Sequence, residues 1–170
     1  MKQLTLVRHA DAQWKDPQIA DFERPLNRRG MAEAQASARR LIELGLLPAL
    51  LLTSPARRAH QTAEILARGL SLSPRSVRAE ESLYLAGAPE ILSVIQALGP
   101  RIPHVMLIGH NPGISEAVQL LAPQYDVQPL STGAMCSMRF DARKWPGVNA
   151  ATLQALHNEA PAVSLFRMWA

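Results

Sequence analysis

Short aliphatic runs recur along the chain, and each is followed by a stretch in which apolar residues repeat at helical spacing. The runs cover residues 3–7, 49–53 and 104–108, and their length and aliphatic content are typical of buried strands. Strands that alternate with helices in this way indicate parallel βα units. The pattern predicts a three-layer α/β/α sandwich with a mostly parallel central sheet.

The first two helices have recognisable boundaries. Asn27 is expected to cap the first helix, and Gly45 to end it. The expected buried face of this helix consists of Met31, Ala34, Ala38, Leu41 and Ile42. A second helix is expected to begin at Ser54, with Pro55 as its first helical residue, and to end before Gly69.

The remaining elements complete the expected sheet. A third helix covers residues 111–121, and residues 91–98 form another. Residues 134–140 and 151–157 have strand character and are expected to pair as a hairpin. Because no internal repeat or linker interrupts the chain, residues 1–170 are expected to form a single domain.

Composition narrows the function classes. The 170 residues carry a formal net charge of +4, which suits phosphate-bearing substrates as well as nucleic acid. Scattered arginines, only 5% aromatic residues and the lack of a known nucleic-acid motif disfavour nucleic acid. The single cysteine, Cys136, fits a reducing, cytoplasmic compartment. The longest apolar stretch, residues 41–52, is interrupted by Glu43, Gly45 and Pro48, so no membrane span is expected.

Basic and imidazole side chains gather where three predicted parallel strands end. Arg8 and His9 follow the first strand, TSPARRAHQT follows the second at residues 53–62, and IGHNPG includes the end of the third at residues 108–113. In open α/β sheets, ligands bind beyond the carboxyl ends of the strands. The three segments are therefore expected to meet at one site.

The second segment indicates the charge of the ligand. Arg57 and Arg58 fall in the first turn of the predicted helix, where the helix dipole disfavours cations. A bound phosphate reverses this argument, because it accepts hydrogen bonds from the free backbone N–H groups and from the guanidinium. His110 and Gly113 also lie at a helix start. The sequence thus predicts an oxyanion site.

Other chemistries have weaker support. His9 and Asp11 could ligate a cation, but nearby arginines would repel it. The remaining histidines, His60, His104 and His157, offer no spacing that completes a coordination sphere. The sequence also lacks a G-x-x-x-x-G-K-S/T phosphate loop, a G-x-G-x-x-G dinucleotide motif and a G-x-S-x-G nucleophile elbow.

Four segments in this order resemble the histidine phosphatase superfamily: LVRHADA, RPLNRRG, TSPARRAHQTAEIL and IGHNPG. The resemblance spans residues 6–113. The RPLNRRG segment, residues 24–30, and the short chain are most similar to bacterial phosphohistidine phosphatases, rather than to the longer phosphoglycerate mutases. The resemblance implies a phosphoglycerate mutase-like fold and an enzyme that needs no metal or cofactor.

The resemblance also implies roles for individual residues. His9 would be the nucleophile, and Arg8, Arg58 and His110, the last as a hydrogen-bond donor, would bind the phosphoryl oxygens. Arg57 becomes a neighbour that could steer the substrate. Phosphoryl transfer mainly needs positioning and charge stabilisation, which two arginines and a second imidazole supply without a metal.

Glu81, in the segment EESLY, is the best positional match to the general acid of the mutase-like and phosphomonoesterase members. It is equally compatible with a solvated acidic residue. An alkoxide leaving group needs protonation far more than a departing imidazole does, so the role of Glu81 depends on the substrate.

Aromatic residues and the cysteine are assigned mainly to packing. Cys136, Trp145 and Trp169 are expected in the core. Trp14 lies in the proline-containing segment of residues 13–26, which could shape substrate access.

The sequence therefore predicts a phosphatase that acts through a phosphorylated His9, with protein phosphohistidine as the preferred substrate. Two alternatives remain: a small-molecule phosphomonoesterase that uses Glu81 as its acid, and a noncatalytic phosphate-binding module. Mutase activity is a weaker option, because it requires a phosphorylated intermediate to rebind and reorient. The expected partner is a phosphohistidine-bearing protein or a small phosphorylated metabolite, with no nucleic acid or membrane involved.

Overall fold

The computed structural model describes residues 1–14 and 16–161. Its strands form a six-stranded sheet with the order β3-β2-β4-β1-β5-β6. The strands are β1 (Lys2–Arg8), β2 (Leu50–Thr53), β3 (Val77–Ala79), β4 (His104–Gly109), β5 (Met135–Phe140) and β6 (Leu153–Glu159). The first four pair in parallel, whereas β5 pairs antiparallel with both β1 and β6. The predicted mostly parallel sheet is confirmed.

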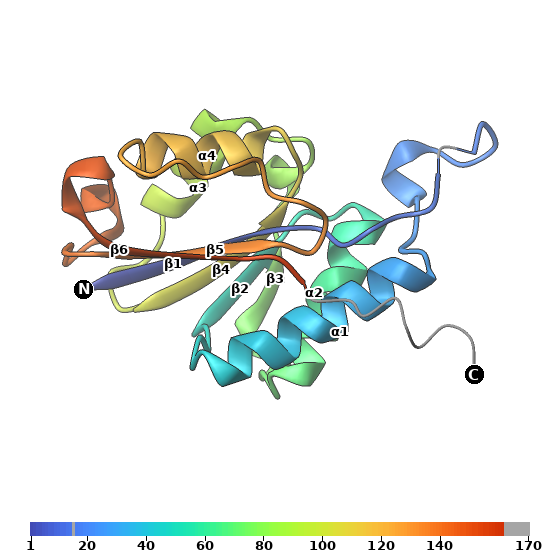
Figure 1. Cartoon of the computed structure of the whole chain (residues 1–170), viewed down its shortest axis with the longest axis horizontal. Helices are drawn as coiled ribbons and strands as arrows, with labels where there is room; N and C mark the ends of the chain where they lie inside the picture. Colours follow the sequence, from blue (N-terminus) through green and yellow to red (C-terminus); the bar gives the residue numbers. More distant parts are fainter. Residues whose placement is uncertain (15, 162–170) are drawn as a thin grey trace.

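Helices cover both faces of the sheet, as Figure 1 shows. The helices α1 (Arg28–Glu43) and α2 (Arg57–Gly69) lie on one face, and α3 (Ala88–Gln96) and α4 (Gly113–Leu121) lie on the other. Successive strand residues point to opposite faces, so the core is divided in two. In β4, Val105 and Leu107 belong to the cluster with α3 and α4, and Met106 and Ile108 to the cluster with α1 and α2. The three-layer prediction is confirmed.

Two parts of the sheet differ from the sequence prediction. The strand β3 has only three residues, all of them at least partly exposed, so it shows no apolar alternation and was not predicted. The strands β5 and β6 pair as expected. They are joined by residues 141–152, which include two 3-10 turns, rather than by a tight hairpin turn.

The buried face of α1 was predicted only in part. Ala34, Ala38 and Leu41 are buried, but Met31 and Ile42 are 45% and 54% exposed. Where α2 approaches most closely, the contact residue of α1 is the small Ala38. A Cβ added at Gly69 of α2 would lie 2.7 Å from the Cβ of Ala38. Large side chains at this contact would hold the two helices apart.

The start of α2 was predicted two residues too early. The backbone N–H of Ser54 still donates to the Ile108 carbonyl oxygen, at 3.0 Å, so this residue extends the sheet rather than capping the helix. Helical geometry begins at Arg57 and includes Gly69. The two arginines nevertheless lie in the first turn, as predicted.

Smaller shifts affect the other two helices. The helix α3 begins at Ala88 rather than at residue 91, since Gly87 is its N-cap and a proline lies in its first turn. The helix α4 begins at Gly113, because Pro112 is its N-cap rather than a helical residue.

Of the cysteine and tryptophans expected in the core, those that the structure describes lie where predicted. Cys136 and Trp145 are fully buried, and burial raises the pKa of the Cys136 thiol to about 12. Trp169 lies outside the described residues. Among the described helices, none is both long and apolar enough to cross a membrane.

Candidate active site

The sheet edge where β1, β2 and β4 end carries a hollow of about 210 Å³. The segment between β1 and α1, drawn in blue at the right of Figure 1, extends beyond this edge. Four predicted site residues line the hollow: Arg8, His9, Arg58 and His110. The structure therefore brings together side chains from three separate strand ends, as the sequence predicted.

The His9 ring is held in one tautomer. Its Nδ1–H donates to the carbonyl oxygen of Ala10 at 2.8 Å, and its Nε2 accepts from the Arg58 Nε at 3.3 Å. Burial lowers the pKa of His9 to about 4; the Ala10 hydrogen bond opposes this effect, and the charges of Arg58, Arg8 and Arg24 add to it. At neutral pH, His9 therefore has an unprotonated Nε2, the form that a nucleophile needs.

Arg58 connects the groups of the site. Its side chain is almost fully buried. It donates to the backbone oxygen of Asp21 at 2.6 Å and to the carboxylate of Asp21 at 3.0 Å. Its Nη2 also lies 3.4 Å from the His110 Nδ1. The guanidinium is thus positioned by an anion and two imidazoles.

Asp21 was not predicted as a site residue. It comes from the segment of residues 13–26, and its carboxylate accepts from Arg24 at 2.9 Å, Arg58 at 3.0 Å and the Tyr84 hydroxyl at 3.0 Å. Burial raises the pKa of Asp21, but these three hydrogen bonds outweigh that effect and lower the pKa to about 2. Asp21 is therefore ionised at neutral pH and holds the Arg58 guanidinium in place.

His110 packs against His9, with the two ring centroids 5.1 Å apart. Its Nε2 lies 2.8 Å from the Ser54 Oγ, and its Nδ1 faces Arg58. Burial lowers the pKa of His110 to about 3, His9 and Arg58 add to this effect, and Asp21 opposes it. In this geometry Nδ1 accepts a hydrogen bond, so the predicted donor role requires protonation when an anion binds.

Arg8 also lines the hollow. Its Nη1 donates to the Leu130 carbonyl oxygen at 2.9 Å. Its Nε is buried and has no hydrogen-bond partner among the described residues. Burial lowers the pKa of the guanidinium, while the charges of Glu33 and Asp11 oppose this effect. Arg8 is thus a partly buried cation with unused donor capacity beside His9.

Sequence comparison identifies the family. A model of the histidine phosphatase superfamily (branch 1) matches residues 4–83. An uncharacterized chloroplastic protein of Arabidopsis thaliana is 33% identical over 129 residues, which cover 71% of this chain and 59% of that protein. An uncharacterized protein of Picosynechococcus is 32% identical over 127 residues, which cover 71% of this chain and 73% of that protein. The chain belongs to the histidine phosphatase superfamily.

Solved structures of this superfamily share the fold over most of the chain. A putative phosphohistidine phosphatase SixA from Agrobacterium tumefaciens has a TM-score of 0.77 at 26% identity, covering 94% of this chain and 99% of that one. The corresponding putative SixA from Nakamurella multipartitia has a TM-score of 0.73 at 27% identity, covering 95% and 97%. The predicted family and fold are confirmed.

Two predicted residues of this histidine phosphatase lie away from the hollow. Arg57 is exposed at the first position of α2. Glu81 is exposed in a 3-10 turn, and the hollow is lined instead by Leu85. From the same segment, Tyr84 bonds Asp21. The segment expected to supply an acid thus supplies a phenol and an aliphatic side chain.

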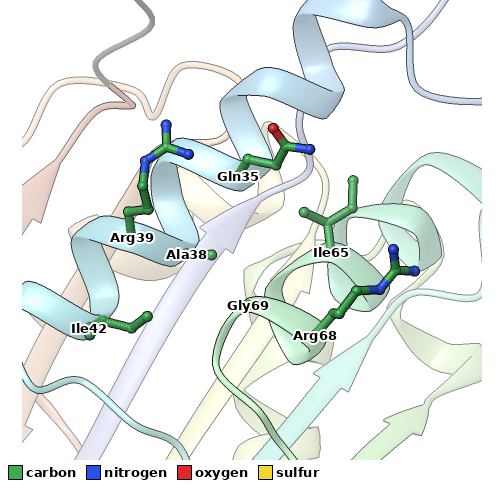
Figure 2. A pocket seen from close by; sticks show the side chains of 7 residues that line it. All are labelled: Gln35, Ala38, Arg39, Ile42, Ile65, Arg68 and Gly69. Carbon is green, nitrogen blue, oxygen red and sulfur yellow. The ribbon is translucent and has the colours of Figure 1, made fainter.

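A second hollow, of about 270 Å³, lies between α1 and α2 (Figure 2). Its lining residues are Gln35, Ala38, Arg39, Ile42, Ile65, Arg68 and Gly69. It is larger than the hollow at the sheet edge, but its lining includes no histidine, carboxylate or hydroxyl group. Chemistry rather than size therefore identifies the candidate active site of the histidine phosphatase.

Proposed function

We propose that this chain is a metal-independent phosphatase that transfers a phosphoryl group to Nε2 of His9, and that protein phosphohistidine is its preferred substrate. The observation that carries this proposal is the His9 ring. Its proton is on Nδ1, its unprotonated Nε2 accepts from the Arg58 Nε at 3.3 Å, and His9, Arg8 and Arg58 all line the same hollow. A nucleophile beside fixed positive charge is the arrangement that phosphoryl transfer requires.

In the first step, Nε2 of His9 forms a bond to phosphorus while the bond between phosphorus and the substrate nitrogen breaks. The departing substrate imidazole takes one proton from water. The His9 ring keeps its Nδ1 proton on the Ala10 carbonyl oxygen, so the phosphorylated ring carries a positive charge. Arg8 and Arg58 stabilise the charge on the phosphoryl oxygens. His110 takes a proton from solvent when the anionic substrate binds, donates a further hydrogen bond to the phosphoryl group, and returns the proton to solvent when phosphate leaves.

In the second step, water attacks phosphorus and the bond between phosphorus and Nε2 breaks. The electron pair returns to Nε2, which regenerates neutral His9. Dihydrogen phosphate leaves and releases its excess proton to solvent. Protons and charges balance over the two steps without a further reactant.

An acid for the leaving group has little support among the described residues, which favours phosphohistidine over phosphate esters. Asp11 lines the hollow, but its carboxylate is held by the Asn27 side-chain amide at 2.9 Å. Glu81 lies away from the hollow, and Asp21, which reaches it through Arg58, is held ionised with a pKa of about 2. An alkoxide leaving group depends on such an acid, whereas an imidazole is a tolerable leaving group once water protonates it. The structural likeness to two putative phosphohistidine phosphatases supports the same substrate class.

The test measures phosphate release from a phosphohistidine-bearing carrier domain, with an aryl phosphate ester as the comparison substrate. We expect rapid release from the carrier and slow release from the ester. His9→Ala should lower carrier dephosphorylation about a thousandfold or more. His60→Ala is the matched control, because His60 is exposed on α2 and should leave the rate unchanged.

The other outcomes would replace the proposal. Faster release from the ester would favour the small-molecule phosphomonoesterase, and Glu81→Gln would then test whether that residue moves to the substrate. If neither substrate is cleaved but phosphate binds, the chain is a noncatalytic phosphate-binding module. A cytoplasmic location and a single-domain organisation stay predictions.

A further inference from the structure

A buried carboxylate lies behind the active site, on α1. The side chain of Glu33 is only 2% exposed and does not line the hollow. A buried carboxylate is unfavourable unless hydrogen bonds and charges compensate it. One of its oxygens accepts from the exposed Arg29 at 3.0 Å, and the other accepts from the backbone N–H of Asp11 at 2.9 Å. The phosphoryl-transfer steps described above do not use this group.

The backbone contact of Glu33 leads directly to the nucleophile. The N–H of Asp11 and the carbonyl oxygen of Ala10 belong to the same peptide group. That carbonyl oxygen accepts the Nδ1–H of His9 at 2.8 Å. His9 and Glu33 therefore bind opposite ends of one peptide dipole. Hydrogen bonds in such a chain polarise one another, and an ionised acceptor strengthens the effect.

Contacts with α1 hold this peptide in place. The backbone N–H of Asn27 donates to the Asp11 carbonyl oxygen at 3.1 Å, and the Asn27 side-chain amide donates to the Asp11 carboxylate at 2.9 Å. A Cβ added at Gly30 would lie 1.9 Å from the same carbonyl oxygen, so the helix start and the loop are in direct contact. These contacts fix Asp11, the residue whose N–H Glu33 binds, against the start of α1.

The charges around His9 include three cations, so a negative charge near its Nδ1 is favourable. The cations that line the hollow are Arg8, Arg24 and Arg58, and His110 is neutral in the free protein. The Asp21 carboxylate is engaged by Arg24, Arg58 and Tyr84. The Asp11 carboxylate also lines the hollow and accepts from the Asn27 side-chain amide at 2.9 Å. The cations suit the phosphoryl oxygens, but they disfavour the positive charge of a phosphorylated ring. Glu33 lies on the Nδ1 side, where that charge is held against the Ala10 carbonyl oxygen.

We propose that Glu33 is a positioning residue for catalysis: its negative charge acts on His9 through the peptide between Ala10 and Asp11, strengthens the hydrogen bond that holds Nδ1–H, and stabilises the phosphorylated ring. The kinetic part of this inference rests on the proposed function. The effect on the Nδ1 hydrogen bond does not, because that bond exists in the free protein.

Glu33→Gln removes the negative charge of the side chain while keeping its size and shape. Glutamine retains an oxygen that accepts from the Asp11 N–H, but it carries no charge. At neutral pH we expect the Nδ1 proton resonance of His9 to move upfield and its exchange with water to accelerate about tenfold. We expect kcat to fall about tenfold with little change in KM, because the ring becomes positive only during transfer.

Arg29→Gln is the matched control. It removes the other partner of Glu33 and keeps the carboxylate charge, so the Nδ1 resonance and kcat should stay close to those of the wild type. Glu33→Asp retains the charge with a shorter side chain and should give intermediate values. It also keeps the inference testable if Glu33→Gln folds poorly.

A purely structural role predicts a different result. In that case Glu33→Gln would lower the unfolding midpoint but leave the Nδ1 resonance, its exchange rate and kcat at the values of Arg29→Gln, and the inference would be wrong. If the wild type releases no phosphate, the proposed function fails, while the resonance and exchange measurements still decide whether Glu33 acts on His9.

Discussion

The two ends of β4 carry two buried histidines in different surroundings. His104 begins the strand, and His110 follows its end. Burial lowers the pKa of His104 to about 4 and that of His110 to about 3. Only His110 lies at a hollow lined by arginines. A lowered pKa therefore shows only that a histidine is buried. The neighbouring charges show whether the buried histidine belongs to a binding site or to the core.

The His104 side chain takes part in an uncharged network. Its Nδ1–H donates to the Leu47 carbonyl oxygen at 3.1 Å, so its Nε2 accepts from the Thr5 hydroxyl at 2.9 Å. Thr5 also bonds the Ser137 hydroxyl at 3.0 Å, which in turn accepts from the Gln3 amide at 3.1 Å. Each of these polar side chains has a partner, which favours a structural role.

The largest expected difference between His110 and His104 is in the activity of their variants. His110→Gln removes an imidazole from the phosphoryl site and should lower kcat/KM for the phosphohistidine carrier about a hundredfold. His104→Gln should change it by less than about threefold, because the network lies at the opposite end of the strand. Phosphate-release kinetics on both variants check this contrast. Similar losses in both would show that the two ends of β4 are functionally coupled.

Stability at acidic pH should depend on His104. Its folded pKa of about 4 lies below the usual histidine pKa of 6.5, so protons bind the unfolded chain more readily. The stabilising effect of the neutral ring is present above pH 6.5 and is lost as pH falls toward 4, by about 3 kcal/mol. Urea unfolding from pH 7 to 4.5 measures this slope, which His104→Gln should reduce. An unchanged slope would assign the acid sensitivity to His9 and His110.

A substitution at Arg58 tests whether the geometry of its guanidinium, and not only its charge, matters at the His110 end of β4. Arg58→Lys keeps the charge but cannot contact Asp21 and the two histidines at once, so kcat/KM should fall about tenfold. The Arg57→Lys variant is a suitable control, because Arg57 is exposed beside it. Equal effects of the two changes would mean that position 57 binds substrate as well.

The smallest effect is expected in the polar network. Thr5→Val leaves the His104 Nε2 without its donor and should lower the free energy of unfolding by about 1 to 2 kcal/mol. Activity should stay within about twofold of the wild type. Urea unfolding at pH 7 and a rate assay on the same sample test both statements. A larger loss of activity would contradict the separation of the two regions.

The sequence predicted which groups meet at the hollow better than it predicted the residues that support them. Four of the predicted residues lie at or after strand ends: Arg8, His9, Arg58 and His110. Parallel strands place their carboxyl ends at one edge of the sheet, whatever conformation the loops adopt. Asp21 and Tyr84 come from segments without a periodic pattern, and only tertiary contacts place them beside Arg58. Arg24 is the exception, since the RPLNRRG segment contained it without a role being assigned.

The errors have related causes. Glu81 was placed by its position in a motif, but its 3-10 turn directs Tyr84 to the site instead. Met31 and Ile42 were placed in the core by their hydrophobicity, but Met31 is exposed, and Ile42 lines the open hollow between α1 and α2. In both cases the local pattern was sound, and the packing of a distant segment decided which side chain faces inward.

The position of β1 also affects when the site can form during synthesis. This strand lies between β4 and β5, and the Gly133 N–H, just before β5, bonds the backbone oxygens of Arg8 and His9 at 3.1 and 3.2 Å. At translation rates of about 5 to 20 residues per second, the nucleophile leaves the ribosome roughly ten seconds before these partners exist. A nascent chain therefore carries His9 without its pocket, and catalytic competence arises only when the sheet closes around its first strand.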